Sequence, residues 1–300
     1  MYTRMHVVYS PRYHIDIGLH VFPTRKYQLV HARLLEAGVI QQRDVIEPDS
    51  APWEDLALVH TREYLAKLRD GTMSGEDIAQ LELPWSPEMV EGFRTMVGGT
   101  AEAARRASAG RTIAAHIGGG LHHAFANHGE GFCPFNDVAV AIRVLQREGV
   151  ERAAVIDLDV HHGNGTAFIF ESDPRVFTFS MHQQHNYPMW KPRSSLDIGL
   201  ADGTGDAEYL RALEEALPKV MASKPDCLFY LAGAGPYQDD QLGGLRLTRD
   251  GLRARDRLVI DLARASGLPT TVVLAGGYAR SVEDTVAIHV ATIEEAARVR

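Results

Sequence analysis

Four short apolar segments of this chain end in glycines or polar side chains, and this pattern restricts the fold more than any other feature. They lie at 112–123, 153–165, 226–235 and 270–278. Such runs are typical of strands in a parallel sheet, where ligands and catalytic groups gather beyond the carboxyl ends of the strands. We therefore expect the four segments to meet in one pocket.

Other elements follow from hydrophobic periodicity and turn residues. We predict strands near 5–9, 112–116, 153–159, 175–180, 226–232 and 270–275, and helices near 24–37, 61–69, 87–110, 136–148, 206–222, 248–266 and 281–297. The helix from Pro87 has the clearest signals, because Ser86 can cap it. Its apolar stripe comprises Val90, Phe93, Val97, Ala101 and Ala104.

The alternation of strands and helices predicts the α/β class, with a mostly parallel sheet covered by helices on both faces. No linker interrupts the alternation, so we predict that residues 1–300 form one domain. Segment 181–205 contains histidines, aromatic residues, prolines and glycines, and we expect it to be a long functional loop.

Composition excludes some classes of function. The net charge of −8 gives no support to a nucleic-acid surface, although it suits cationic peptides or amines as substrates. Cys133 and Cys227 predict a reduced protein rather than a disulfide framework. No segment approaches the ~20 apolar residues of a membrane span, and residues 1–9 enter a strand without a signal peptide. We expect a soluble, cytoplasmic protein with no membrane or nucleic-acid partner, and its oligomeric state stays open.

Polar side chains gather at the end of the 153–159 strand. Asp157, Asp159 and His161 alternate with apolar residues, so an extended backbone would project all three to one side. Burying two carboxylates and an imidazole is costly unless they meet partners or a cation. A divalent metal is the simplest partner, and a hydrogen-bonded strand end is the plainer alternative.

Several motifs carry a resemblance to a known family. GGGLHHA at 118–124, GFCPFND at 131–137, IDLDVHHGNG at 156–165 and AGGY at 275–278 resemble, in order, the motifs of the zinc-dependent histone deacetylase family, which has the arginase/deacetylase fold. VHTREY at 59–64 and YSPRY at 9–13 also resemble that family. The length and the GNG tripeptide are similar to class IV and related bacterial members.

The resemblance implies a reaction and a cofactor. Asp159 and His161 would hold Zn²⁺, which lowers the pKa of a bound water toward neutrality. That metal-bound water would attack an acylated lysine in a peptide or protein, or a related acylated amine, and release an acetyl or longer acyl group.

The same resemblance assigns catalytic roles. His122 and His123 would act near the water as general base and as general acid or electrostatic partner. Asp157 would orient His122, and Asn164 would orient His123. Tyr278 would donate its hydroxyl to the acyl carbonyl oxygen. An isolated His-His pair is more often two partly exposed polar residues than a catalytic pair, and only the surrounding motifs favour the catalytic interpretation.

The substrate channel and a second cation site are also implied by resemblance. Gly131 and Phe132 would form one wall of a narrow channel for the acyl-lysine stem, with Tyr187 opposite, although Phe132 could equally be core. Ser180, with Asp157, would belong to a K⁺ site. We expect the remaining histidines of these motifs to be structural, His162 as a satisfied core residue and His116 and His182 as supports.

One position departs from the family pattern. Active relatives carry an aspartate, the third zinc ligand, where this chain has Gly235 in the sequence AGAG. Asp239 and Asp240 follow on the same loop, but similar relatives have both in addition to the ligand, so we do not expect substitution. Catalytic zinc usually holds three protein ligands plus water. We therefore expect weak zinc binding and low or absent turnover.

Three functions remain open at this point. The first is a zinc-dependent amidohydrolase whose activity Gly235 reduces or abolishes. The second is a catalytically silent protein that binds acyl-lysine. The third, a ureohydrolase with paired manganese ions, would need more carboxylate ligands than these strand ends provide.

Overall fold

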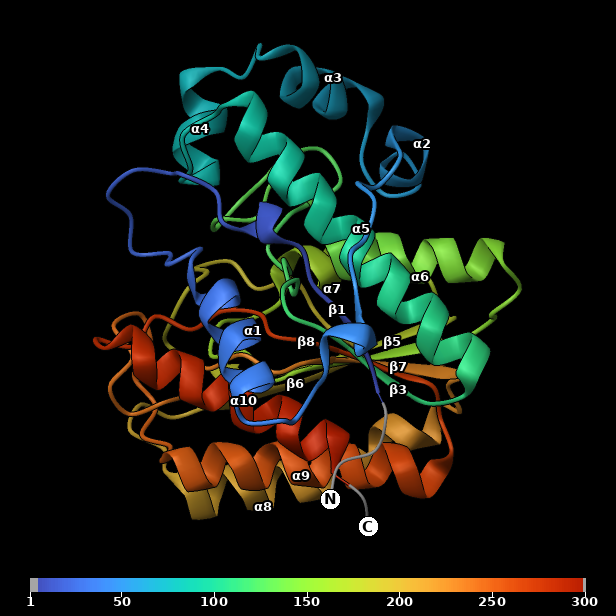
Figure 1. The fold of residues 1–300 in the computed structure, drawn as a ribbon, viewed down its shortest axis with the longest axis vertical. Helices are drawn as coiled ribbons and strands as arrows, with labels where there is room; N and C mark the ends of the chain where they lie inside the picture. The colour runs from blue at the N-terminus through green and yellow to red at the C-terminus, as the bar shows by residue number, and fades with distance from the viewer. Residues whose placement is uncertain (1–4, 299–300) are drawn as a thin grey trace.

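The computed structural model describes residues 5–298, and within them a single eight-stranded sheet runs through the middle of the molecule (Figure 1). Its strands are β1 (His6–Val8), β2 (Val45–Ile46), β3 (Ile113–His116), β4 (Ala153–Asp157), β5 (Val176–Gln183), β6 (Leu196–Leu200), β7 (Cys227–Leu231) and β8 (Thr270–Val273). Their order across the sheet is β2-β1-β3-β8-β7-β4-β5-β6, and every neighbouring pair is parallel. The predicted α/β class with a parallel sheet is confirmed.

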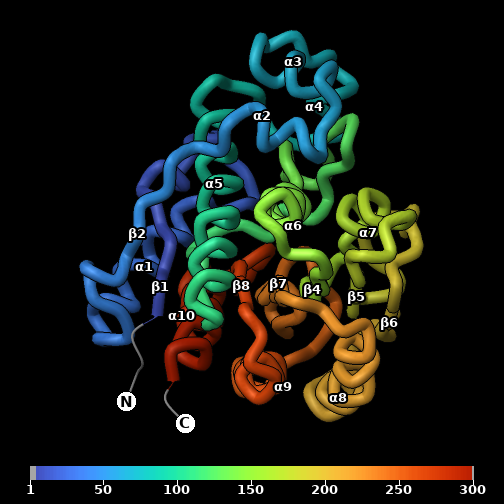
Figure 2. Tube along the Cα trace, turned by 90° about the vertical axis from the view of Figure 1, so that its right-hand side faces the viewer, coloured from blue at the N-terminus to red at the C-terminus, as the bar shows by residue number. Residues whose placement is uncertain are grey.

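Helices cover both faces of the sheet. On one face lie α5 (Pro87–Gly110), α6 (Asp137–Arg147) and α7 (Asn164–Phe170), and on the other lie α8 (Asp206–Ala222), α9 (Arg249–Ser266) and α10 (Val282–Ala297) (Figures 1 and 2). Helix α1 (Lys26–Glu36) packs against α10. The short helices α2 (Trp53–Leu56), α3 (Arg62–Asp70) and α4 (Gly75–Leu81) lie beyond α5, at the top of Figure 1.

Helix α5 forms where local signals predict it. Ser86 accepts a hydrogen bond from the backbone N–H of Met89 at 3.0 Å, and Pro87 occupies the first turn. The predicted stripe, Val90, Phe93, Val97, Ala101 and Ala104, is entirely buried. This stripe packs α5 against the sheet and against α6.

The prediction of a long loop at 181–205 is wrong at both ends. Strand β5 continues to Gln183, and β6 occupies Leu196–Leu200. Strand β6 pairs only with β5, at the edge of the sheet, and its first four residues are not buried. Because an edge strand faces solvent in this way, it lacks the continuous apolar run that marks a central strand. Strand β2 and helices α2, α4 and α7 were also not predicted, although Ser74 and Asp77 form a capping box at the start of α4.

The backbone after β4 is bent rather than extended. Strand β4 ends at Asp157, whose Oδ1 accepts the backbone N–H of Asp159 at 3.1 Å. Asp159 Oδ1 in turn accepts the backbone N–H of His161 at 3.0 Å. Each carboxylate therefore stabilises a turn by accepting the backbone N–H of the residue two positions later in the chain. The prediction that an extended strand projects all three side chains to one side is wrong.

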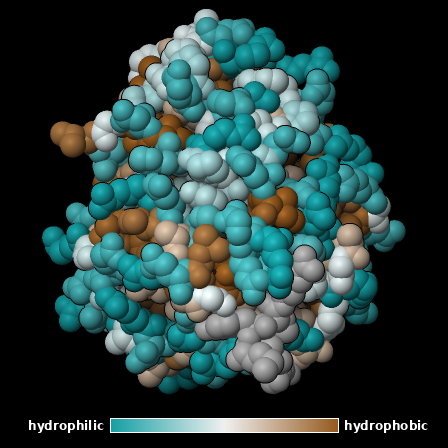
Figure 3. Space-filling view, viewed as in Figure 1, coloured by the Kyte–Doolittle hydropathy of each residue, from teal (hydrophilic) through white to brown (hydrophobic). Residues whose placement is uncertain are grey.

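The surface and the cysteines carry little functional information. The face in Figure 3 is mostly hydrophilic, with apolar residues in separate patches. None of the helices within residues 5–298 combines the length and apolar composition of a membrane span. Cys133 and Cys227 are both buried and unpaired.

A buried histidine should make the fold sensitive to acid. His116 Nδ1 and Nε2 lie 2.9 Å from the hydroxyls of Thr100 and Tyr13, and burial lowers the pKa of His116 to about 3. Below the ordinary pKa of 6.5 the unfolded chain takes up a proton on this ring, whereas the folded chain does not. The contribution of His116 to stability is therefore full above pH 6.5, and between pH 6.5 and 3 it falls by about 1.4 kcal/mol per pH unit.

We predict that His116→Gln shrinks the difference in unfolding free energy between about pH 7 and about pH 5 by up to about 2 kcal/mol. Urea unfolding followed by circular dichroism measures both values. The matched control is His14→Gln, because His14 is exposed, and it should leave the wild-type difference unchanged. An unaltered pH difference in His116→Gln would contradict the neutral, buried imidazole.

Candidate active site

Most of the candidate residues meet at the carboxyl edge of the sheet. A cavity of about 20 Å³ is lined by His122, His123, Gly131, Phe132, Asp159, His161 and Tyr278. It is large enough for one water molecule. An outer cavity of about 160 Å³ shares five of these residues and adds Tyr187. The segments after β3, β4 and β8 thus form one pocket, as predicted, whereas the end of β7 does not line it.

A buried carboxylate holds the first imidazole. His122 Nδ1–H donates to Asp157 Oδ2 at 2.6 Å, and both residues are buried. Burial disfavours the charged ring, but Asp157 outweighs it and raises the pKa of His122 to about 9. His122 is therefore a cation at neutral pH.

An amide holds the second imidazole. His123 Nδ1–H donates to Asn164 Oδ1 at 2.6 Å. Burial, followed by the charges of His122 and His161, lowers the pKa of His123 well below 6.5. His123 is therefore neutral, and its Nε2 keeps a lone pair because Nδ1 carries the proton. The two adjacent rings differ in charge because one has a carboxylate partner and the other an amide.

Glycines and a carboxylate shape the loop that carries both rings. Gly119 and Gly120 have φ of +70° and +83°, and a Cβ at Gly120 would lie 2.6 Å from the Cα of Ala275. Only glycine fits this close approach without strain. Asp137, at the start of α6, accepts the backbone N–H groups of Gly120 at 3.0 Å and Leu121 at 2.7 Å.

Two side chains offer donors to a metal. His161 Nε2 lies 3.2 Å from the Leu242 carbonyl, which can only accept, so Nε2 carries a proton and Nδ1 is the ring nitrogen that could bind a metal. This Nδ1 lies 3.3 Å from Asp159 Oδ1. Two ligands of a tetrahedral zinc, with bonds of about 2 Å, lie about this far apart. Asp159 and His161 therefore fit one edge of a zinc site.

At Gly235, where the resemblance implies a third ligand, neighbouring side chains leave little room. Gly235 follows β7, and a Cβ there would lie 2.5 Å from Val160 Cγ1. Val160 is fully buried and β-branched, so it cannot easily move aside. Catalytic zinc usually has three protein ligands, so the donors present fit it only in part: Gly235 carries no side chain, and a Cβ there would clash with Val160.

Asp240, an acidic residue on the loop after Gly235, already accepts hydrogen bonds through both of its oxygens. Asp240 Oδ1 accepts the backbone N–H groups of Leu242 at 2.9 Å and Gly243 at 3.0 Å, and its Oδ2 accepts that of Tyr278 at 2.6 Å. With both oxygens engaged, Asp240 holds the loop that carries Tyr278. Burial, followed by Asp159, raises the pKa of Tyr278 well above 10, so its hydroxyl stays protonated and can donate.

The residues predicted to wall a substrate channel line the outer cavity. Gly131 and Phe132 have φ of +52° and +65°, and both line the outer cavity. A Cβ at Gly131 would lie 2.8 Å from the His123 ring and 3.0 Å from the Tyr187 ring. The Tyr187 ring packs edge-on to His123, with centroids 5.0 Å apart. Aromatic walls of this kind suit an apolar stem.

Beside the pocket lies a polar cluster. Ser180 pairs with Asp157 across β4 and β5, and its Oγ lies 3.0 Å from His182 Nδ1. His162 Nε2 lies 3.1 Å from Asp197 Oδ1. The potential ligand atoms of His162, His182 and Asp197 lie within 4.8 Å of one another, although His182 is hydrogen-bonded to Ser180 rather than to the other two. His162 Nδ1 has no partner, so the prediction of a satisfied histidine holds for one ring nitrogen only.

His116 is buried and lines neither of the two cavities.

Two residues near the pocket were missed by sequence analysis. Lys26 is fully buried, and its Nζ donates to the Ala275 carbonyl at 2.9 Å. Burial lowers the pKa of Lys26 to about 8, and no local signal distinguishes it from a surface lysine at a helix start. Glu130 accepts hydrogen bonds from Asn164 and Tyr187. Its position directly before Gly131 was the only available signal.

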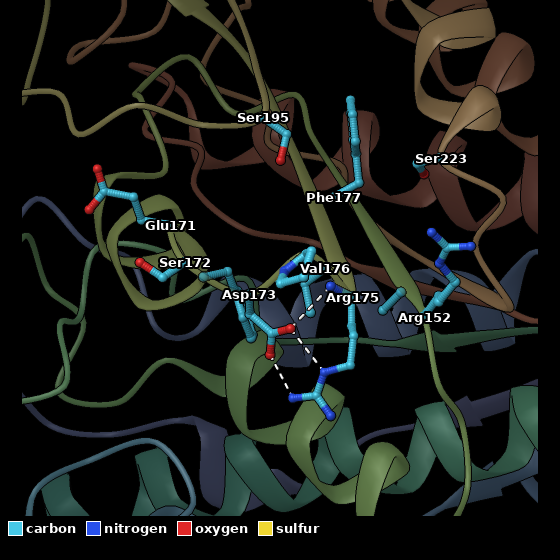
Figure 4. A pocket seen from close by; sticks show the side chains of 12 residues that line it. Arg152, Glu171, Ser172, Asp173, Arg175, Val176, Phe177, Ser195 and Ser223 are labelled. Atoms are coloured by element: carbon cyan, nitrogen blue, oxygen red, sulfur yellow. Dashed lines mark hydrogen bonds and ion pairs between the residues drawn. The ribbon is translucent and has the colours of Figure 1, made fainter.

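A third cavity lies away from these residues. It measures about 280 Å³ and sits beside Ala153 and Val176, the first residues of β4 and β5 (Figure 4). Figure 4 shows Asp173 and Arg175 paired within it. Because none of the candidate residues lines this cavity, we assign no chemistry to it.

Comparisons with known proteins agree with this geometry. A family model described as the histone deacetylase domain matches residues 20–293. Among relatives, an uncharacterized protein of Picosynechococcus is 43% identical over 94% of this chain and 95% of its own length. Histone deacetylase 2 of Arabidopsis thaliana is 32% identical over 95% and 77%, and acetoin utilization protein AcuC of Bacillus subtilis is 31% identical over 90% and 76%.

The fold agrees as well. The crystal structure of the HDA15 HD domain superposes with a TM-score of 0.81 at 25% identity, covering 97% of this chain and 87% of that one. The arginase/deacetylase-like fold is thereby confirmed. A family match over most of the chain, relatives above 30% identity and this shared fold lead to one conclusion: the chain belongs to the histone deacetylase family.

Proposed function

We propose that this chain hydrolyses an acylated amine, releasing an acetyl or longer acyl group from lysine in a peptide or protein or from a related amine, and that Gly235 weakens its hold on zinc. The observation that carries this proposal is the convergence of two oriented imidazoles, a protonated tyrosine hydroxyl and two metal donors on one small cavity. Family membership supports the amidohydrolase class.

The side chains divide the proton transfers among them. Neutral His123 would take a proton from the attacking water and return it to the leaving amine. Cationic His122, fixed by Asp157, would stabilise the negative charge that develops beside it. The Tyr278 hydroxyl would donate to the acyl carbonyl oxygen as that oxygen gains charge. Phe132 and Tyr187 would enclose the apolar stem and exclude water.

Asp159 and His161 are the residues that would hold zinc. When bound, zinc would act as a Lewis acid on the acyl carbonyl. Loss of a residue that merely supports a metal ligand typically costs about 10–100-fold in affinity or activity, so the loss of a ligand at Gly235 should cost at least as much.

A second function is favoured by the packing at Gly235. Position 235 carries no side chain, and a Cβ there would lie 2.5 Å from Val160 Cγ1. A catalytically silent protein that binds acyl-lysine would keep the channel residues Phe132 and Tyr187 and dispense with the metal.

Two finer proposals accompany the first. Ser180 and Asp157 would contribute to a K⁺ site. This site stays a prediction, and Ser180 Oγ also contacts His182. We also propose a cytoplasmic location, supported by the unpaired Cys133 and Cys227.

Restoring the third ligand should restore zinc and activity. We predict that Gly235→Asp with Val160→Ala, which removes the clash with the new Cβ, binds zinc at least tenfold more tightly than the wild-type chain. Zinc per chain after dialysis and release of acetate from an acetyl-lysine peptide measure both effects. The matched control is Gly235→Asn with Val160→Ala, which has the same size without the charge.

The outcomes separate the two functions. Near-stoichiometric zinc in the dialysed wild-type chain would contradict the weakened site. A restored variant that holds zinc and binds the peptide without cleaving it would contradict hydrolysis and favour the silent binding protein.

The charge on His122 is also testable. In metal-free protein we predict that His122 titrates near pH 9 and that Asp157→Asn lowers its pKa, because burial is then opposed only by the smaller effects of Asp159 and Asp137. Nuclear magnetic resonance of the imidazole ring measures both values. Asp226→Asn is the control, because Asp226 is an exposed residue before β7. An unchanged His122 pKa in Asp157→Asn would contradict the assigned ion pair.

A further inference from the structure

Four donors converge on the side chain of Glu130. Its Oε1 accepts from Asn164 Nδ2 at 2.7 Å and from the Tyr187 hydroxyl at 3.1 Å. Its Oε2 lies 3.4 Å from Gln80 Nε2 and 3.4 Å from His128 Nε2. Only 16% of the side-chain surface is exposed. Burial opposes ionisation, but the bonds from His128, Asn164 and Tyr187 lower the pKa of Glu130 overall, so it is an anion at neutral pH.

The Asn164 amide can adopt only one orientation between its partners. Its Oδ1 accepts from His123 Nδ1–H at 2.6 Å, and its Nδ2 donates to Glu130 at 2.7 Å. If the amide were flipped, Oδ1 would face the carboxylate of Glu130, and two acceptors would oppose each other. Glu130 therefore fixes which amide atom His123 meets.

The amide also transmits charge. Asn164 is 1% exposed, and in such a weakly polarisable setting hydrogen bonds in a chain strengthen one another. A carboxylate bonded to Nδ2 draws electron density toward Oδ1, which becomes a stronger acceptor for His123 Nδ1–H. His123 thus interacts with the negative charge of Glu130 through one intervening amide, whereas His122 contacts the Asp157 carboxylate directly.

The backbone after Glu130 links this chain of bonds to the channel. Gly131 follows directly and lies against both the His123 ring and the Tyr187 ring. Phe132, with φ of +65°, then turns into the outer cavity. One carboxylate therefore holds together both channel walls and the ring between them.

We propose that Glu130 is a positioning residue of this active site, which orients and polarises His123 through Asn164 and aligns Tyr187 with the same ring. The assignment rests on the proposed hydrolytic function, in which His123 is the base. It explains how Asn164 can serve as the partner of His123, since Glu130 supplies, through the Asn164 amide, the negative charge that an asparagine lacks.

The first test uses the metal-free wild-type chain and needs no activity. The His123 Nδ1–H proton, bonded at 2.6 Å, should give a far-downfield resonance, and Glu130→Gln should move it upfield because the charge is lost while the shape is kept. The His122 Nδ1–H resonance serves as an internal reference and should stay in place. A His123 resonance that does not move would overturn the proposal, whatever the chain hydrolyses.

Two matched variants separate polarisation from simple support of the loop. Gln80→Ala removes a donor from the same carboxylate, and Tyr187→Phe removes the hydroxyl but keeps the ring. Both should leave the His123 resonance in place, and Tyr187→Phe should change only KM in the restored enzyme. If either variant moved the resonance as far as Glu130→Gln does, Glu130 would act through the loop rather than through Asn164, and the proposal would fail.

The second test is rescue in the zinc-loaded protein that carries Gly235→Asp and Val160→Ala. There, Glu130→Gln should lower kcat by about tenfold, the size typical of residues that support a reacting group through a hydrogen bond, with KM changed less than about twofold. Adding Asn164→Asp puts a carboxylate directly on His123 and should return kcat. Failure of this rescue would overturn the proposal. An inert zinc-loaded protein would instead count against hydrolysis, and the resonance test would still decide the role of Glu130.

Discussion

Buried carboxylates that accept backbone N–H groups from distant loops hold this active site together. Asp137 holds Gly120 and Leu121, Asp159 Oδ2 accepts the N–H of Gly276 at 3.0 Å, and Asp240 holds Tyr278. A desolvated carboxylate is costly unless it is hydrogen-bonded, so each of these loops has little freedom to move. Hydrogen bonds of the protein itself therefore position the imidazoles, the tyrosine and the two residues that would hold zinc.

The same principle gives the two adjacent histidines different chemistry. His122 contacts a carboxylate and carries a proton, whereas His123 contacts an amide and is neutral. Two identical side chains in one cavity thus become a cation and a neutral ring, because only His122 has a carboxylate partner to offset burial. Gly235 offers no side chain where the resemblance implies a carboxylate, and a Cβ there would meet the apolar Val160.

Local signals account for the elements that sequence analysis predicted. Helix α5 matched from Pro87 to Gly110, because its cap and its apolar stripe lie within its own residues. Strand β6 was missed because it has one neighbour and a partly exposed face, and α7 because it begins inside the GNG motif. The motifs that carry the resemblance contain most of the residues that line the inner cavity, but not Glu130 or Lys26, which lie nearby. Their partners lie 34 and 249 residues away, beyond the range of any local pattern.

The sequence by itself determined the fold class, the family motifs and the absence of a side chain at position 235, because each of these depends on residue identity and local periodicity. The tertiary structure alone decided which atoms meet: that Val160 fills the space beside Gly235, that the Asn164 amide joins His123 to Glu130, and that the backbone bends after Asp157. Contacts of this kind depend on where separate strand ends and loops come to lie once the core is packed, and no stretch of sequence encodes that alone.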